Sequence, residues 1–171
     1  MTYWIGQGFG ILAIVFGFVS YQVKTQRSLL LVQSLTAVAF CAHYGLLGAF
    51  PAMVMNALNI VRNVVYDRRN QRNDTRPTIP ILFAVLQAAM CLLTWNAWYC
   101  VFILVGIVAN TLFMSLQNPQ TVRKSILFTS IIILVYDLFA SAYGGALYES
   151  VALISAAIGI WRMAKKEKKE P

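Results

Sequence analysis

Seven long apolar runs within 171 residues constrain this chain more than any other feature of its sequence. A helix that crosses a bilayer needs about 20 mostly apolar residues, whereas lipid-facing β-strands alternate apolar and polar side chains. Because backbone groups in lipid must be satisfied internally, we expect an all-α membrane protein with seven transmembrane helices. The expected spans are 3–23, 28–47, 49–66, 79–95, 98–116, 123–140 and 145–163.

The composition also favours a membrane protein, because 59% of the residues are hydrophobic and only 12% are charged. A soluble domain carries about twice that charged fraction. The cysteines Cys41, Cys91 and Cys100 lie in or beside apolar runs without C-x-x-C spacing. We interpret them as packing residues and expect no disulfide framework and no metal site. The first run follows no basic segment, so we expect it to stay in the membrane as a helix.

Lys and Arg are sorted onto alternate links between the runs. They lie in or beside the links after the first, third and fifth runs and in the C-terminal tail, and the other links carry none. Cytoplasmic loops are enriched in Lys and Arg, so we predict an outside N-terminus and a cytoplasmic C-terminus. The net charge of +8 then reflects orientation and contact with the lipid bilayer, and we expect no nucleic-acid partner.

Short sequence matches recur between the blocks on either side of run 79–95. They are GILA at 10–13 with GIVA at 106–109, SLL at 28–30 with SIL at 125–127, Tyr44-Gly45 with Tyr143-Gly144, and ALNIVR at 57–62 with AIGIWR at 157–162. Parallel repeats are a transporter architecture. We therefore predict one membrane domain, 1–171, in a 3+1+3 arrangement: first three-helix repeat 3–66, basic cytoplasmic loop 67–78, connector helix 79–95, second three-helix repeat 98–163 and basic cytoplasmic tail 164–171.

The 3+1+3 plan and the pair Pro119-Gln120 are similar to the SWEET and PQ-loop group of carriers. Over nearly its whole length the chain more closely resembles the bacterial YgjV-type inner-membrane family. The resemblance implies a multi-pass protein of the bacterial inner (plasma) membrane, and it says more about architecture than about chemistry. The motifs that carry this resemblance are Tyr3-Trp4, Gln7-Gly8, HYGLLG at 43–48, Asn56-Ala57, Arg62, Gly144-Gly145, Glu149 and IWR at 160–162.

The chain departs from the SWEET pattern at three places. Lys24-Thr25 stands near the place of a second Pro-Gln, Tyr136 stands where sugar carriers tend to use Trp, and Asn56 aligns near Ser155 instead of a second Asn. These departures count against a sugar as the solute. Tyr136 nevertheless remains a candidate for lining a substrate cavity.

Three ionisable residues lie inside the predicted spans near their outer ends: His43, Asp137 and Glu149. Ionisable groups within membrane helices are functional candidates by default. All three fall roughly 5–6 Å inside the outer boundary, so they could form one polar layer, such as an external gate or a proton-linked site. The alternative is interfacial: a shallow carboxylate reaches water, and a lone His hydrogen-bonds a backbone carbonyl.

Deeper polar residues are candidates for solute contact. Asn56 and Asn59 share a helix face, and an Asn amide suits hydroxyl or amide groups of a substrate. The resemblance favours Asn56 as cavity-lining, with Ser155 opposite in the second repeat. The alternative is inter-helix hydrogen bonding, which we favour for Asn110; Gln33 and Gln87 are interpreted as packing polar groups.

Proline and arginine mark the inner ends of the helices. Pro119 and Gln120 are hinge candidates by resemblance to PQ-loop carriers, and a simple helix end is the alternative. Arg62 and Arg162 occupy matching places, and we expect them at the inner boundary, extending to the lipid headgroups. A role in binding an anionic substrate is the less favoured alternative.

Two functional hypotheses follow from these residues. The first is a SWEET-like small-solute transporter or facilitator that works by rocking of two three-helix bundles around a small polar solute, with protons coupled through Glu149 or Asp137 if any ion is. The second is a non-transporting membrane receptor or accessory subunit of the same fold. We see no nucleophile–base pair, phosphate loop or cofactor motif, so we expect no enzyme and no cofactor. One chain holds both repeats, so a homo-oligomer is possible but not required.

Overall fold

The computed structural model describes residues 2–48, 50–95, 97–139 and 143–167, and all regular structure in these ranges is α-helical. This confirms the all-helical prediction for the described chain. The helices are α1 (Thr2–Ser20), α2 (Gln26–Leu46), α3 (Phe50–Gln71), α4 (Thr78–Leu93), α5 (Cys100–Met114), α6 (Pro119–Phe139) and α7 (Tyr143–Glu167).

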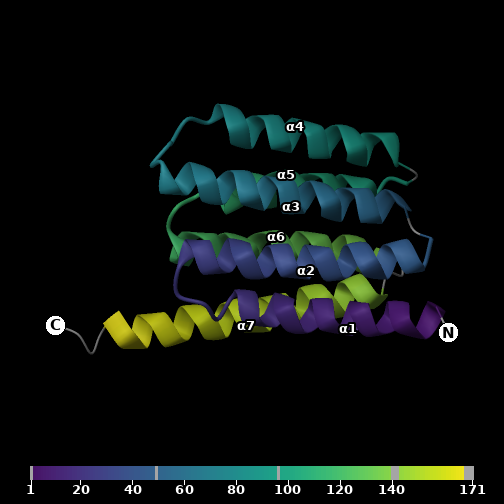
Figure 1. The fold of residues 1–171 in the computed structure, drawn as a ribbon, viewed down its shortest axis with the longest axis horizontal. Coiled ribbons are helices and arrows are strands. Elements are labelled where there is room, and N and C mark those ends of the chain that lie inside the picture. Colours follow the sequence, from purple (N-terminus) through teal and green to yellow (C-terminus); the bar gives the residue numbers. More distant parts are fainter. Residues whose placement is uncertain (1, 49, 96, 140–142, 168–171) are drawn as a thin grey trace. The chain divides into compact units, whose positions relative to one another are not determined.

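The helices belong to two compact units, Met1–Thr75 and Arg76–Pro171. In the first unit α2 packs against both α1 and α3, and in the second α4 packs on α5, α5 on α6 and α6 on α7 (Figure 1). The predicted connector, 79–95, corresponds to α4. Because α4 packs on α5, it is part of the second unit and not a separate link.

Local capping chemistry explains where α2 and α6 begin. The Thr25 hydroxyl oxygen accepts a hydrogen bond from the backbone N–H of Ser28 at 3.1 Å, which caps α2. Asn118 does the same for α6, since its Oδ1 accepts from the backbone N–H of Gln120 at 2.9 Å. Pro119 fills the first helical position, where its missing N–H costs nothing. Helix α6 therefore starts four residues before the predicted 123.

Helix α3 runs to Gln71, five residues beyond its predicted end at 66. Asn73 adopts φ 51°, the left-handed conformation that closes helices, and the N–H of Asp74 reaches back to the carbonyl of Arg69 at 3.1 Å. The first part of the predicted loop 67–78 is thus helical. Likewise α7 continues to Glu167, into the predicted tail, while 140–142 and 168–171 lie outside the described residues.

By length and composition, α2 is the described helix that is long and apolar enough to cross a membrane, and shorter apolar helices are Trp4–Ser20, Thr78–Leu93 and Cys100–Met114. The 15 residues of α5 span only about 22 Å, against a hydrocarbon core of about 30 Å. Helices α3, α6 and α7 are long enough but carry several charged residues. Seven crossings therefore stay a prediction.

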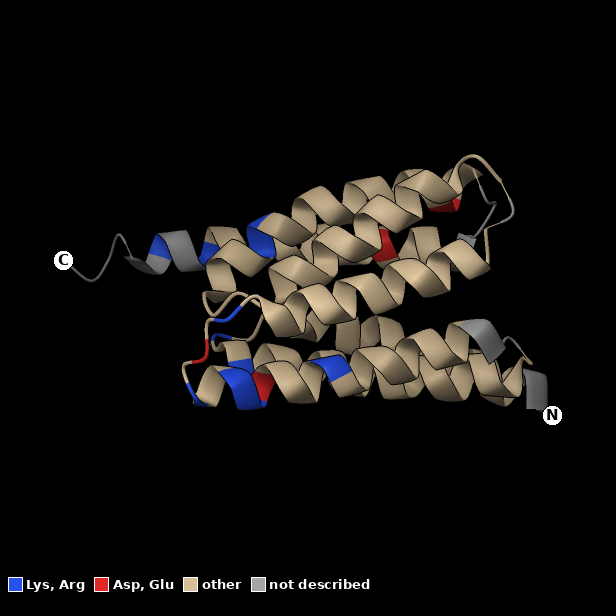
Figure 2. Ribbon diagram, turned by 90° about the horizontal axis from the view of Figure 1, so that it is seen from above, with Lys and Arg blue, Asp and Glu red and all other residues tan. Residues whose placement is uncertain are grey.

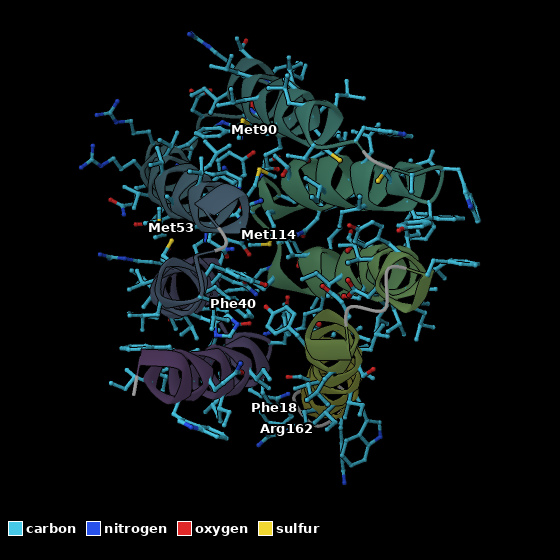
Figure 3. The ribbon with its side chains drawn as sticks, turned by 90° about the vertical axis from the view of Figure 1, so that its right-hand side faces the viewer. Phe18, Phe40, Met53, Met90, Met114 and Arg162 are labelled. Atoms are coloured by element: carbon cyan, nitrogen blue, oxygen red, sulfur yellow. The ribbon has the colours of Figure 1, made fainter. Side chains whose placement is uncertain are left out.

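The described helices expose many large apolar side chains and bury several polar ones among their apolar contacts, unlike a soluble bundle. Leu82 and Val85 of α4 are 64% and 60% exposed, whereas Thr111 and Ser155 are wholly buried. Figure 3 shows the side chains projecting around each helix, with the labelled Met53 sulfur between α2 and α3. Burying a Leu or Val gains about 1.5–3 kcal/mol in water, so outward faces of this kind favour a hydrocarbon surrounding.

Charge is sorted within each unit considered by itself. Figure 2 shows Lys and Arg segments gathered towards one end of the first unit, away from the N-terminus. In the second unit they gather towards the end where α7 finishes, and the acidic segments inside the helices lie away from that end. This is the sorting that the sequence predicted for each block.

Three of the four repeat matches join equivalent helices in the two units. Gly10 lies in α1 and Gly106 in α5, and each faces the next helix: a Cβ on Gly10 would lie 3.0 Å from the His43 ring of α2, and one on Gly106 2.5 Å from Ile133 of α6. The match of Tyr44-Gly45 with Tyr143-Gly144 fails structurally. The first pair closes α2, whereas the second opens α7.

Candidate functional site

A carboxyl group lies buried between α6 and α7. The Asp137 side chain is 7% exposed, and a Cβ built on Gly145 of α7 would lie 2.7 Å from Oδ1 and 2.8 Å from Oδ2. So close an approach requires a residue without a side chain at 145. Oδ2 of Asp137 is buried and has no hydrogen-bond partner in the part of the chain that the structure describes. The carboxyl group is therefore held in the helix seam by packing and not by polar contacts at this oxygen.

A second carboxyl group joins Asp137 in this seam. Glu149 lies four residues after Gly145 and so on the same face of α7, one turn further from the α6–α7 link. It is half-buried and lies near enough to the Ser130 side chain and to Asp137 for electrostatic interactions. Ser130 is 4% exposed and lies two turns before Asp137 on α6. The structure thus brings together two of the three predicted ionisable residues.

His43 belongs to the first unit, where it joins α2 to α1. Its Nδ1 lies 2.7 Å from the backbone oxygen of Gly6, and its ring fills the space beside Gly10. The pair Gly6 and Gly10 lets the ring approach the α1 backbone, as small residues do in membrane helix pairs. The interaction is the backbone hydrogen bond that the sequence analysis gave as the alternative for His43.

Tyr136 lies beside Asp137 in an aromatic cluster at the junction of α5 and α6. Its ring centroid is 5.8 Å from that of Tyr99, and the Trp98 and Phe139 rings are 5.1 Å apart. Stacked and edge-to-face contacts of this kind contribute about 0.5–1.5 kcal/mol each beyond their burial. The cluster fixes the last turn of α6 and so the position of Asp137.

The predicted solute-contact residues lie on α3 and α7. The Asn56 amide donates to the carbonyl of Ala52 in its own helix at 2.9 Å, and its Oδ1 has no partner among the described residues. Asn59 is half-buried one turn further along α3. Ser155 is wholly buried on α7. Asn56 and Ser155 belong to different units, so each is described only within its own.

The two matching arginines differ in exposure. Arg62 is 4% exposed and donates from Nε and a terminal nitrogen to Oδ1 of Asn63, at 3.2 and 3.0 Å. It therefore does not extend to the surface as expected. Arg162 is exposed near the end of α7, where the sequence placed it. Pro119 and Gln120 lie in the first turn of α6, and the hinge assigned to them stays a prediction.

Gln33 and Gln87, which the sequence analysis interpreted as packing polar groups, each bond to another helix or its end, and only their partners were not predicted. The Thr111 hydroxyl of α5 donates a short hydrogen bond to Gln87 of α4, and both side chains are buried. In the first unit Gln33 of α2 donates to Ser20 and Tyr21, each at 2.9 Å. Gln33 and Gln87 each stand in a largely apolar run, and this was the signal for a polar contact that the sequence offered. The sequence carried no such signal for the roles of Ser130 and Gly145, because both roles depend on the register of α6 against α7.

Comparison with known proteins gives one family. A model of the family Imp-YgjV, described as a bacterial inner membrane protein, matches residues 4–167. The chain is also similar to the inner membrane protein YgjV of Escherichia coli (strain K12), with 24% identity over 169 residues that cover 96% of this chain and 89% of that protein. No solved structure matches the chain.

Proposed function

The chain belongs to the Imp-YgjV family of bacterial inner membrane proteins, and from that premise we propose that it is a multi-pass small-solute transporter or facilitator. The observation that carries this proposal is the buried Asp137 carboxyl group beside Glu149 in the α6–α7 seam. Polar groups buried inside membrane helices are costly and typically mark substrate or ion pathways. A protein with a purely structural role in the membrane has no need of an acidic pair there.

The proposed topology has seven crossings, with the N-terminus outside and the C-terminus in the cytoplasm. Lys and Arg at one end of each unit support this orientation through the positive-inside rule. The short helices α4 and α5 would cross with local thinning of the bilayer and with their flanking residues at the interface. The exposed Trp98 at the start of α5 fits such an interfacial position.

In the proposed mechanism the bundle α1–α3 and the bundle α5–α7 rock during transport, as in SWEET-like carriers. Asn56 supports a solute contact on α3, because its half-buried Oδ1 is available to accept from a hydroxyl or an amide. Tyr136 and Ser155 are the corresponding candidates in the second unit. Departures from the SWEET pattern favour a polar solute other than a sugar.

A second candidate is a receptor or an accessory subunit of the same fold. The observation that favours it is the extension of α3 to Gln71, which holds the exposed Arg68 in an ordered helical turn beyond the predicted membrane boundary. A rigid basic surface of this kind suits an acidic cytoplasmic partner. In this case function would depend on Arg68 and its neighbours and not on Asn56.

A thermal-shift screen of the purified full-length protein separates these candidates. Sugars, polyols, amino acids and small organic acids are tested at two pH values against the wild type, Asn56→Ala and the control Gln71→Ala, which changes an exposed amide on the same helix. A ligand at about 100 times its Kd adds about 2.7 kcal/mol of stability. We expect a selective ligand whose effect is lost in Asn56→Ala and kept in Gln71→Ala.

Other outcomes would change the proposal. A ligand that stabilises Asn56→Ala as much as the wild type would remove Asn56 from the solute site. Failure of every compound class on a well-folded sample would favour the accessory-subunit candidate, and binding of an acidic partner that is lost in Arg68→Ala would establish it.

A further inference from the structure

We propose that Asp137 and Glu149, with the Ser130 hydroxyl, form one proton-binding site within the helices, in which the two carboxyl groups hold a single proton between them at neutral pH. The proposal deepens the proposed transport function by naming its coupling ion. Only the coupling role rests on that function. Proton binding itself can be measured whether or not a solute is transported.

The geometry supplies two acids in one confined place. The Asp137 carboxyl group lies against Gly145, and Glu149 follows one turn later on the same face of α7. The buried Oδ2 of Asp137 has no partner among the described residues, which leaves an oxygen free to carry a proton. Gly145 is what permits this arrangement, because any side chain there would displace the carboxyl group from the seam.

Among the described residues, no Lys or Arg lies in the turns of α6 and α7 that hold the pair. Neither carboxyl group has an ion-pair partner among the described residues. Lys124 on α6 is 13 residues from Asp137, and Arg162 on α7 is 13 residues from Glu149. Both distances correspond to about 20 Å along the helix. Two neighbouring carboxylates without a countercharge repel each other, so the pair keeps a proton that isolated acids would lose.

The groups around the pair are neutral at this pH. On α6 they are Ser130 and Tyr136, and Tyr136 interacts electrostatically with Tyr99, which precedes α5, with Cys100 of α5 and with Cys91 of α4. Phenols and thiols are protonated at neutral pH, so they add no charge that would replace the shared proton. In the proposed site the Ser130 hydroxyl is the donor available to an ionised Glu149 carboxylate.

The two neighbours of Glu149 thus act in opposite directions. A negative charge on Asp137 disfavours a second negative charge beside it, whereas a hydroxyl donor such as Ser130 favours one. Binding forms an O–H bond on one carboxyl oxygen with a proton taken from water, and release returns that proton without any electron transfer. The charge of the pair alternates between minus two and minus one, which is the change needed to link proton movement to a helix rearrangement.

The test is infrared difference spectroscopy of the full-length protein in liposomes, recorded between about pH 8 and about pH 5 in H2O and in D2O. The C=O stretching band of a protonated carboxyl group is followed as a function of pH. We expect such a band near neutral pH, with a frequency that falls in D2O. The variants are Asp137→Asn, Glu149→Gln and Ser130→Ala, and the control is Asp67→Asn, an acid paired with Arg27 at 3.8 Å in the other unit.

The expected shifts have opposite signs. In Asp137→Asn the band should form about one pH unit lower or further, because the remaining Glu149 loses a negative neighbour. In Ser130→Ala it should form at higher pH, because the ionised acid loses a donor. The Asp67→Asn control should leave the band unchanged. Thermal unfolding of each variant shows that it is folded, and Ser130→Ala, the smallest change, preserves the test if a carboxyl variant does not fold.

Three results would overturn the proposal: no band near neutral pH in the wild type, a band retained in the double variant Asp137→Asn with Glu149→Gln, or equal midpoints in the wild type, Asp137→Asn and Ser130→Ala. A band that responds to Na+ or K+ at constant pH would show a metal-cation site and not a proton site.

The two proposals can fail separately. If the thermal-shift screen finds a ligand but the band is missing, the transport proposal remains and proton coupling is refuted. If the band behaves as predicted but the screen finds no ligand, the proton site remains and the transport proposal loses its support.

Discussion

Replacing Gly106 by Ala tests the packing of α5 against α6, which positions the proposed proton site. The new Cβ would lie 2.5 Å from Cγ1 of Ile133, about 1.0–1.5 Å inside an ordinary carbon–carbon contact. Cγ1 is the first atom beyond Cβ, so the Ile side chain cannot move away without a new rotamer or a helix shift. Overpacking of this kind costs about 1–3 kcal/mol.

The matched control is Gly8→Ala on α1. Nothing lies within 4 Å of a Cβ at Gly8, so this variant reports only the preference of a helix for Ala over Gly, a gain of about 0.5–1 kcal/mol. Both glycines lie inside helices, so the same gain applies to Gly106 and cancels in the comparison. The two variants should therefore differ by about 1–3 kcal/mol, or about 5- to 160-fold in the unfolding equilibrium.

Equilibrium unfolding of the two variants in mixed micelles measures this difference. Ile133→Ala removes the atoms that the new Cβ meets, so combining it with Gly106→Ala should recover most of the steric loss as a positive coupling in a double-mutant cycle. Equal stability of Gly106→Ala and Gly8→Ala, or a cycle without coupling, would refute the packing of α5 on α6 described above.

Three further substitutions test individual contacts described above, and the same unfolding assay measures each of them. Thr111→Val removes the buried hydrogen bond to Gln87 and should cost about 0.6–1.7 kcal/mol; a neutral effect would mean that the hydrogen bond between α4 and α5 contributes nothing. Thr25→Ala removes the cap of α2 and should cost about 0.5–2 kcal/mol, whereas a gain in stability would contradict the capping geometry. Arg27→Gln breaks an exposed ion pair with Asp67 and should cost no more than about 1 kcal/mol, with the loss vanishing at high salt; a larger, salt-independent loss would point to a different contact.

The sequence predicted the helices well because each apolar run is long and uninterrupted. It misplaced their ends where a local cap decides the boundary. Asn73 in a left-handed conformation ends α3 later than predicted, and Asn118 with Pro119 starts α6 early. Hydrophobicity averages over many residues, whereas a cap depends on a single side chain and its backbone angles. Boundaries are therefore set by chemistry that the apolar pattern does not contain.

The candidate site was predictable only in part, for a similar reason. Asp137 and Glu149 stand out because carboxyl groups are rare inside apolar runs. Gly145 was predicted as the first residue of the span 145–163, and its contact with Asp137 depends on the register of two antiparallel helices, which no pattern within either helix encodes. The burial of Arg123, which is 0% exposed, was missed because a basic residue at a predicted link is normally solvated.

Membrane crossing by the short helix α5 is the most direct test of the proposed topology. The protein without its three cysteines receives a single cysteine at Thr94 or at Gln117, exposed positions that flank α5. Intact cells are treated with a membrane-impermeant maleimide after removal of the outer-membrane barrier. We predict labelling of Thr94→Cys in intact cells, and of Gln117→Cys only after the inner membrane is permeabilised. Equal labelling of both positions from outside, or the reverse pattern, would contradict the proposed seven-helix carrier.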